Sequence, residues 1–251
     1  MLEPLAEPHR YDGLVSRTPL PTKPHRRRWR STPPEITLQP EALLRGLTLA
    51  LPAVIAAVVC SYLLFDEDVA RWAHHAPREL SEWAGRISDL AHGTPLVVIA
   101  VVLGLIAALA RKWALVSNAL LLIFALAATG GVNVLLKMIL GRARPTNQVN
   151  EDDIWTGAGH DGFYFFEVGY KLMGFPSGHS AAAGAVAAVG LMIRPTLWPL
   201  WLVFAALIPA TRVLSNAHYV SDTIAGVWVG AACAAGVALW VKKFNARYAD
   251  A

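Results

Sequence analysis

The chain has 251 residues, of which 55% are hydrophobic and only 16% are charged, and its mean hydropathy is +0.42. This composition is far more apolar than that of an ordinary soluble domain of the same length, so it argues against a soluble globular protein and indicates a membrane protein. The formal net charge is +4, and the positions of Lys and Arg along the chain carry more information than this sum.

Residues 1–42 differ from the rest of the chain. They contain eight of the sixteen prolines and show no helical period, which predicts a disordered, basic cytoplasmic tail. The cluster HRRRWR at 25–30 either serves only as a topology signal or also touches anionic lipid. Residues 43–242 are predicted to form a membrane domain, and residues 243–251 a short cytoplasmic C-terminal tail.

Apolar runs of roughly twenty residues recur through the predicted membrane domain, and a helix of that length crosses the hydrocarbon core. Lys and Arg are concentrated before the first run and after the last, so both termini are predicted to be cytoplasmic. The segments 66–94, 137–174 and 215–222 then face the outer side. The runs predict an all-α, polytopic bundle of six transmembrane helices, near 45–65, 95–110, 113–136, 175–193, 196–214 and 223–241.

The outer segments offer no pattern typical of a metal site. The first of them carries Trp72 and Trp83 among mixed charges, as an interfacial amphipathic helix would. The acidic run 151–153 lacks the spaced oxygen ligands of a calcium or magnesium loop and is interpreted as a solvated loop. We therefore predict neither a metal nor another cofactor. Three histidines with no carboxylate or cysteine at metal-ligand spacing are predicted to be surface residues: His74, His75 and His92.

Polar residues gather at the outer ends of the last four runs. Charges in or near membrane spans are costly and usually functional, and the orientation that places these residues together was derived from other charges. Considered one at a time, each residue also fits a structural role, such as an interfacial histidine or a helix cap. Such roles do not explain why all of them lie on the same side of the membrane. The residues are Lys137, Arg144, Ser177, His179, Arg212, His218 and Asp222.

The cations in this group predict an anion site. Lys137, Arg144 and Arg212 would repel one another at a common level, and a bound anion with several oxygens would relieve the repulsion.

The stretch FPSGHS, residues 175–180, adds backbone donors to that site. Pro176 suits the first position of a helix, which would leave the N–H groups of Ser177, Gly178 and His179 unpaired. Such helix-start donors bind phosphate or sulfate, and Gly178 would let the backbone approach the anion closely.

The two histidines of the group have different surroundings. His218 and Asp222 are four residues apart, so on a helix the carboxylate can accept from one ring nitrogen and leave the other as a nucleophile. His179 has no carboxylate in its own segment and is better suited to donate a proton. A nucleophile, an acid and an anion site together predict phosphoryl transfer through a phosphohistidine.

The spacing of these residues resembles the three-part signature of the type 2 phosphatidic acid phosphatase superfamily, which includes vanadium haloperoxidases. The matching segments are Lys137-x6-Arg144-Pro145, then PSGH at 176–179, then Arg212-x5-His218-x3-Asp222. One departure is Thr211 before Arg212, where the family usually has Ser. The resemblance implies that His218 attacks phosphorus, Asp222 orients it and His179 protonates the leaving oxygen. It also implies phosphate-binding residues: Lys137, Arg144, Ser177, Gly178 and Arg212.

The resemblance further implies a metal-independent bacterial lipid phosphatase in the inner membrane, with its active site on the periplasmic face. The soluble haloperoxidase branch is disfavoured by the predicted spans. The expected partners are the bilayer and a lipid phosphate of the lipid A, undecaprenyl diphosphate or phosphatidylglycerophosphate class, with no nucleic acid. Two alternatives use the same residues: a lipid phosphotransferase, and an anion transporter, which the position of the charges at one face rather than at the midplane disfavours.

Overall fold

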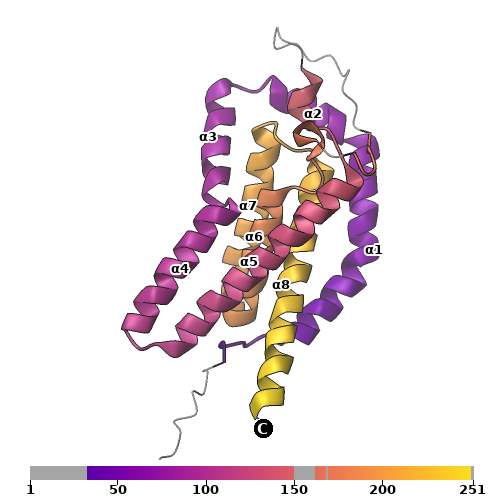
Figure 1. Cartoon of the computed structure of the whole chain (residues 1–251). Helices are drawn as coiled ribbons and strands as arrows, with labels where there is room; N and C mark the ends of the chain where they lie inside the picture. Colours follow the sequence, from indigo (N-terminus) through magenta and orange to yellow (C-terminus); the bar gives the residue numbers. More distant parts are fainter. Residues whose placement is uncertain (1–32, 150–161, 168, 250–251) are drawn as a thin grey trace, which may run out of the picture. The chain divides into compact units, whose positions relative to one another are not determined.

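The computed structural model describes residues 33–149, 162–167 and 169–249, and residues from Ser31 onward form one compact unit (Figure 1). The predicted tail up to residue 32 and the acidic run 151–153 lie outside the described residues. Within them the predicted all-α class is confirmed, because β character is limited to isolated bridges, such as those of Arg142 with Phe163 and Met173. The α-helices are α1 (Pro40–Leu64), α2 (Asp66–His74), α3 (Arg78–Leu90), α4 (Gly93–Leu109), α5 (Trp113–Leu140), α6 (Gly178–Ile193), α7 (Trp198–Leu214) and α8 (Val220–Ala249), with short 3-10 turns η1 (Pro145–Gln148), η2 (Tyr170–Leu172) and η3 (Pro195–Leu197).

Each of the six predicted apolar runs is helical, but the helices differ in length. Four segments of the described chain are long and apolar enough to cross a membrane alone: α1, α5, η3 with α7, and α8. The pair α3 and α4 passes the same test together but is bent by 43°. Helix α6 has 16 residues, so it is about 24 Å long, shorter than a typical span. The chain is therefore a multi-pass membrane protein by length and composition, and the count of six spans stays a prediction.

Helix α6 lies at the centre of the bundle, packed against α5, α7 and α8 (Figure 1). Its sequence GHSAAAGAVAAVGLMI is rich in Ala and Gly, and small side chains let helix backbones approach closely in a membrane. A Cβ placed on Gly184 of α6 would overlap the carbonyl of Val227, and one on Gly230 of α8 would overlap the carbonyl of Ala181. The α6–α8 contact is therefore made backbone against backbone.

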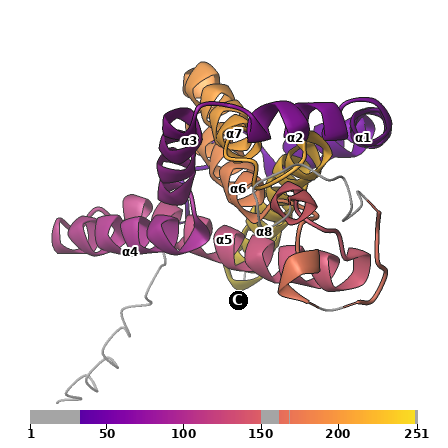
Figure 2. The same ribbon diagram turned by 90° about the horizontal axis from the view of Figure 1, so that it is seen from above.

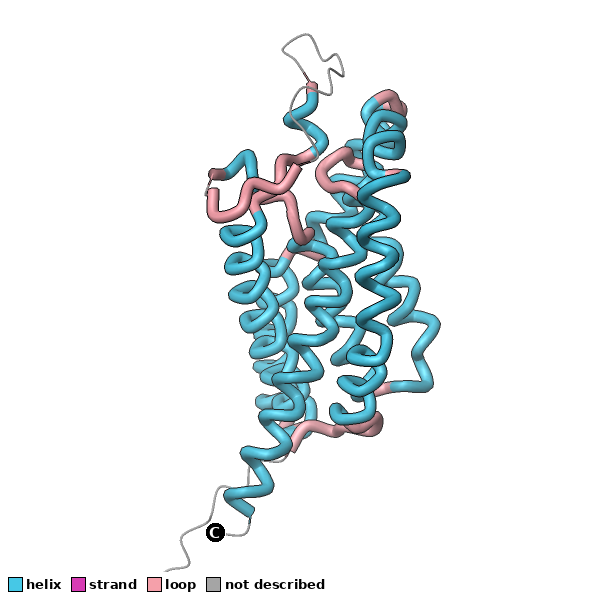
Figure 3. Tube along the Cα trace, turned by 90° about the vertical axis from the view of Figure 1, so that its right-hand side faces the viewer, coloured by secondary structure: helices cyan, strands magenta, loops and turns pink. Residues whose placement is uncertain are grey.

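The segments predicted to lie on the outer side gather at one end of the bundle. Helices α2 and α3 and the described parts of the chain between α5 and α6 lie at the end opposite the C-terminus (Figures 1 and 3). Seen from that end, α2 lies across the bundle, whereas α3 stands beside α7 (Figure 2). This arrangement surrounds the start of α6 with loops and short helices.

At the opposite end of the bundle, hydrogen bonds and an ion pair connect the start of α1 to other helices. This helix begins at Pro40, and the N–H groups of Thr37 and Leu38 both donate to the carbonyl oxygen of Met192, at 2.8 and 3.0 Å. Lys242 of α8 forms an ion pair of 2.9 Å with Glu41 of α1. The two ends of the described chain therefore meet at the end of the bundle away from α2 and α3.

Candidate active site

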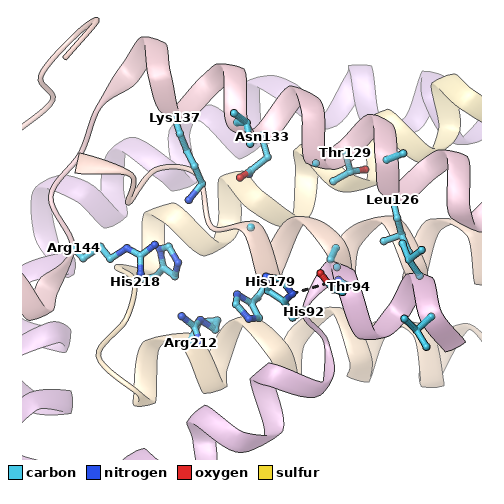
Figure 4. A pocket seen from close by; sticks show the side chains of 18 residues that line it. His92, Thr94, Leu126, Thr129, Asn133, Lys137, Arg144, His179, Arg212 and His218 are labelled. Carbon is cyan, nitrogen blue, oxygen red and sulfur yellow. Dashed lines mark hydrogen bonds between the residues drawn. The ribbon is translucent and has the colours of Figure 1, made fainter. Parts of the chain in front are cut away.

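A cavity of about 560 Å³ opens among α4, α5, α6 and α7 (Figure 4). The labelled cations and histidines gather at one end of it, while Thr129 and Leu126 lie further along α5. The lining residues away from the cations are mostly apolar: Val97, Val98, Leu126, Ala127, Val134 and Ala182. One cavity thus has a positively charged end and an apolar end.

The three predicted cations all line the charged end of this cavity. Lys137, in the last turn of α5, donates from Nζ to the carbonyl oxygen of Met173 at 2.7 Å. Arg212, on α7, donates from Nη1 to Ser88 Oγ at 2.9 Å and is only 8% exposed. Arg144 comes from the loop after α5. Three positive groups from separate segments are therefore brought to one place, as the sequence predicted.

The start of α6 differs from the prediction. Ser177 is the N-cap and Gly178 the first helical residue, so the expectation that Pro176 occupies the first helical position is wrong. The physical reason is that the Ser177 side chain caps the helix: its Oγ accepts from the N–H of Ser180 at 3.5 Å and from Ser180 Oγ at 3.0 Å. A Ser N-cap satisfies helix-start donors that a proline cannot.

Ser177 also differs from the prediction in its backbone. Its N–H donates to the carbonyl oxygen of Asp222 at 3.0 Å, so this group is paired, contrary to expectation. Ser177 is fully buried and is not among the residues that line the cavity. Gly178 and His179 do line it, and a Cβ on Gly178 would reach Asn133 Oδ1 at 3.5 Å. The helix-start donors at the cavity are therefore those of Gly178 and His179.

His179 lies between the cavity and α3. Its Nε2 is 3.7 Å from Asp89 Oδ1 at the end of α3, and its ring centroid is 5.0 Å from that of His92. His92 was predicted to be a surface residue; it is exposed but also lines the cavity. The acid proposed from the sequence thus has a carboxylate within reach from another helix.

His218 and Asp222 meet as their spacing predicted. His218 precedes α8 instead of lying on it, and its Nδ1 is 3.4 Å from Asp222 Oδ2. The same oxygen accepts from the N–H of Tyr219 at 3.0 Å, so the Asp222 side chain satisfies a backbone donor at the start of α8. His218 is 3% exposed and lines the cavity, whereas Asp222 is fully buried behind it.

The protonation state of His218 follows from this burial. Removal from water lowers the pKa of His218 to about 4, although the hydrogen bond and charge of Asp222 oppose the shift. The ring is therefore neutral near pH 7. With Nδ1 held on the carboxylate, Nε2 is left as an acceptor, which is the form that a nucleophilic imidazole requires.

Several residues around this site were not found by sequence reasoning. Asp66, Arg142 and Ser221 form a buried hydrogen-bonded cluster behind Asp222. Arg142 lies inside the first motif as its second basic residue before Pro145, a signal that the spacing alone left unassigned. Within the described ranges, no group of three His, Cys, Asp or Glu side chains is placed to hold a metal ion.

Comparisons with known proteins identify relatives of this chain. The chain is 36% identical over 110 residues to the lipid A 1-phosphatase of Rhizobium johnstonii, covering 44% of this chain and 42% of that protein. It is 35% identical over 96 residues to the lipid A 1-phosphatase of Rhizobium etli, covering 38% of each. The match thus spans about two fifths of the length of these relatives.

A solved structure shares the fold. The crystal structure of a transmembrane PAP2-type phosphatidylglycerolphosphate phosphatase from Bacillus subtilis superposes with a TM-score of 0.51 and 21% identity, covering 83% of this chain and 96% of that one. Residues 118–246 match the family model described as the PAP2 superfamily. These residues contain every member of the proposed site, from Lys137 to Asp222, and the chain belongs to the PAP2 superfamily.

Proposed function

We propose that this protein is a membrane lipid phosphatase that acts through a phosphohistidine on His218. The observation that carries the proposal is a cavity with a cationic end, where His218 and His179 lie, and an apolar end between α4 and α5. A phosphate needs the first environment and a lipid tail the second. A free-phosphate enzyme would have no use for the apolar end.

The first step forms a covalent intermediate. Nε2 of His218 attacks phosphorus, the bond from phosphorus to the leaving oxygen breaks, and His179 gives that oxygen a proton. Asp222 holds Nδ1–H and stabilises the positive charge that develops on the ring. The charge on the phosphoryl oxygens is stabilised by Lys137, Arg144 and Arg212, with the N–H groups at the start of α6.

The second step returns the enzyme to its starting state. A water molecule attacks phosphorus, the bond between nitrogen and phosphorus breaks, and His179 takes a proton from the water. Inorganic phosphate leaves, and His218 is again a neutral imidazole. We propose that no metal takes part, because the three cations supply the positive charge that phosphoryl transfer demands.

The proposed substrate class is lipid A or a related lipid phosphate. Two relatives carry the name lipid A 1-phosphatase, and their matched parts cover less than half of either protein. Undecaprenyl diphosphate and phosphatidylglycerophosphate are the competing classes, and all three carry a phosphate group and long apolar chains in one molecule. The apolar lining from Val97, Val98 and Leu126 suits such a chain.

We propose six spans in the bacterial inner membrane, with residues 43–242 as the membrane domain and both termini cytoplasmic. The gathering of α2, α3 and the α5–α6 chain at the end away from the basic residues Lys242, Lys243 and Arg247 supports this orientation. The cationic end of the cavity is then on the periplasmic side. The short helix α6 would begin at the active site instead of at the membrane surface.

The test is phosphate release by purified protein from a panel of lipid A, undecaprenyl diphosphate and phosphatidylglycerophosphate, with and without EDTA. Wild-type protein should release phosphate equally in both conditions, and His218→Ala should lose at least about 1,000-fold in kcat. His75→Ala is the matched control, because His75 is exposed at the same end of the bundle and does not line the cavity. Full turnover in His218→Ala, or loss of activity with EDTA, would contradict the mechanism. Transfer of label to a second lipid instead of water would indicate a phosphotransferase.

A further inference from the structure

Arg142 is a completely buried cation that the proposed chemistry does not yet use. It does not line the cavity but lies directly behind Asp222. Its Nη1 donates to Asp222 Oδ1 at 2.5 Å and to Ser221 Oγ at 2.7 Å, and its Nη2 donates to Asp66 Oδ2 at 2.9 Å. The guanidinium group therefore joins two carboxylates from different parts of the chain.

Aromatic rings surround the guanidinium group. Its central carbon lies 4.1 Å from the ring centroid of Tyr219, 5.1 Å from that of Tyr62 and 5.4 Å from that of Phe163. Ring faces attract a cation and exclude water from it, so Arg142 has little freedom to move. A fixed fork of this kind also fixes the carboxylate that it binds.

Asp66 anchors the other side of Arg142. It is 1% exposed at the first residue of α2 and accepts from Ser61 Oγ at 2.8 Å and from the N–H of Ser221 at 3.0 Å. The hydroxyl of Ser221 also donates to it. Because Ser221 directly precedes Asp222, this carboxylate ties the α1–α2 corner to the start of α8.

The charges of this cluster do not cancel. Asp66 and Asp222 contribute two carboxylates and Arg142 one guanidinium group, all out of contact with water, so the buried side of His218 faces more carboxylates than cations. The three cations Lys137, Arg144 and Arg212 lie on its other side, at the cavity. The imidazole of His218 becomes positive when Nε2 bonds to phosphorus, because Nδ1 keeps its proton. A carboxylate on the buried side stabilises that positive ring, and so it stabilises the covalent intermediate.

We propose that Arg142, anchored by Asp66, is a positioning residue that holds Asp222 on His218. Because Arg142 is shared between two carboxylates, it does not neutralise Asp222 completely, and the remaining negative charge stabilises phosphorylated His218. The proposal rests on the phosphatase mechanism above. It differs from a purely structural salt bridge, because the identity and charge of Arg142 should alter the chemical step and leave lipid binding unchanged. Lipid binding depends on the residues that line the cavity, and Arg142 is not one of them.

Three variants separate these roles. Arg142→Gln removes the positive charge, Arg142→Lys keeps the charge but cannot donate to both carboxylates in the same fork, and Asp66→Asn removes one negative charge. The measurements are kcat and KM for the lipid of the panel that wild-type protein hydrolyses fastest, across the pH range in which the protein stays folded. The other ionisable groups facing His218 are the same in every variant: Lys137, Arg144, His179, Arg212 and Asp222.

Arg142→Gln should lower kcat by about 100-fold with KM changed less than about threefold. It should also move the acid limb of kcat/KM to higher pH, because loss of a nearby positive charge favours protonated His218. Arg142→Lys should lower kcat without moving that limb. Asp66→Asn should lower kcat by about tenfold and should not move the limb to higher pH, because it removes a negative charge instead.

Arg142→Gln and Asp66→Asn change the charge in opposite directions. If both moved the acid limb of kcat/KM in the same direction, structural damage would be the cause and the proposal would be overturned. An unchanged kcat in Arg142→Gln would also overturn it. If Arg142→Gln fails to fold, Asp66→Asn decides: wild-type kcat, or a loss confined to KM, contradicts the proposal. Absence of phosphate release by wild-type protein, or full activity of His218→Ala, would instead contradict the proposed function. The two failures are therefore distinguishable.

Discussion

Asp89 of α3 places its Oδ1 3.7 Å from Nε2 of His179 on α6. The carboxylate is largely exposed, whereas His179 is mostly enclosed. A negative charge within about 4 Å favours a proton on the ring, so Asp89 should assist the step in which His179 protonates the leaving oxygen.

Asp89→Asn should therefore slow hydrolysis of lipid phosphates by about fivefold, because an exposed partner contributes little. The loss should shrink with p-nitrophenyl phosphate, whose leaving group departs without a proton. His179→Ala should show the same dependence on the leaving group with a much larger loss on lipid substrates. Equal losses on both substrates would contradict a role for Asp89 in proton donation.

Ser88, the neighbour of Asp89, holds Arg212. Its fully buried hydroxyl accepts from Arg212 Nη1 at 2.9 Å and donates to the carbonyl oxygen of Gly85 at 2.8 Å. Ser88→Ala should free the guanidinium group and lower kcat/KM by about threefold to tenfold, because one hydrogen bond to a charged group is lost. Ser81→Ala on the same helix is the control, since Ser81 does not line the cavity. An unchanged kcat/KM in Ser88→Ala would contradict this role.

The pKa of His218 gives the protein a pH-dependent stability. The folded-state pKa of about 4 lies below the ordinary value of 6.5, so the unfolded chain binds more protons between these values. The stability from neutral His218 is fully present above the unfolded pKa and is lost as pH falls towards the folded one. The unfolding temperature in detergent should fall less on acidification in His218→Asn than in wild type. An identical fall in both proteins would contradict the pKa.

The α6–α8 contact predicts a sharp difference between two glycines of one helix. A Cβ on Gly230 would overlap the carbonyl of Ala181, which is backbone and cannot give way, whereas one on Gly236 meets nothing within 4 Å. Gly230→Ala should destabilise the protein by about 2 kcal/mol or more, and Gly236→Ala should be neutral or stabilising because Ala favours helix. Thermal unfolding of the two variants in one detergent measures this, and similar unfolding temperatures would refute it.

Much of the site was predictable because its residues lie close in sequence to helix ends. His218 and Asp222 are four residues apart at the start of α8, so their contact is local in sequence even though His218 lies before the helix. Lys137 and Arg212 end apolar runs, so their common level follows from the topology. The helical positions themselves follow from the runs of apolar residues.

The residues that were missed depend on contacts distant in sequence. Asp66 and Arg142 are 76 positions apart, and each, considered alone, is a charge at a helix end. Only the folding of α2 across the end of the bundle brings them together. The predicted position of Pro176 was wrong for a related reason. The N–H of Ser177 donates to the carbonyl oxygen of Asp222, a contact distant in sequence, and this contact helps to place Ser177 instead of Pro176 at the start of α6.

Two main-chain contacts act together. The N–H of Ser177 donates to the Asp222 carbonyl, and Gly230 packs directly against the Ala181 carbonyl. The helix that carries the acid and the segment that carries the nucleophile are held in register by main-chain atoms, so this register depends on Gly184 and Gly230 having no side chain and not on the identity of larger side chains. The opposite wall of the cavity, on α4 and α5, is formed by side chains such as those of Val97 and Leu126. Related enzymes can therefore acquire new lipid preferences by changing that wall while the reacting groups keep their spacing.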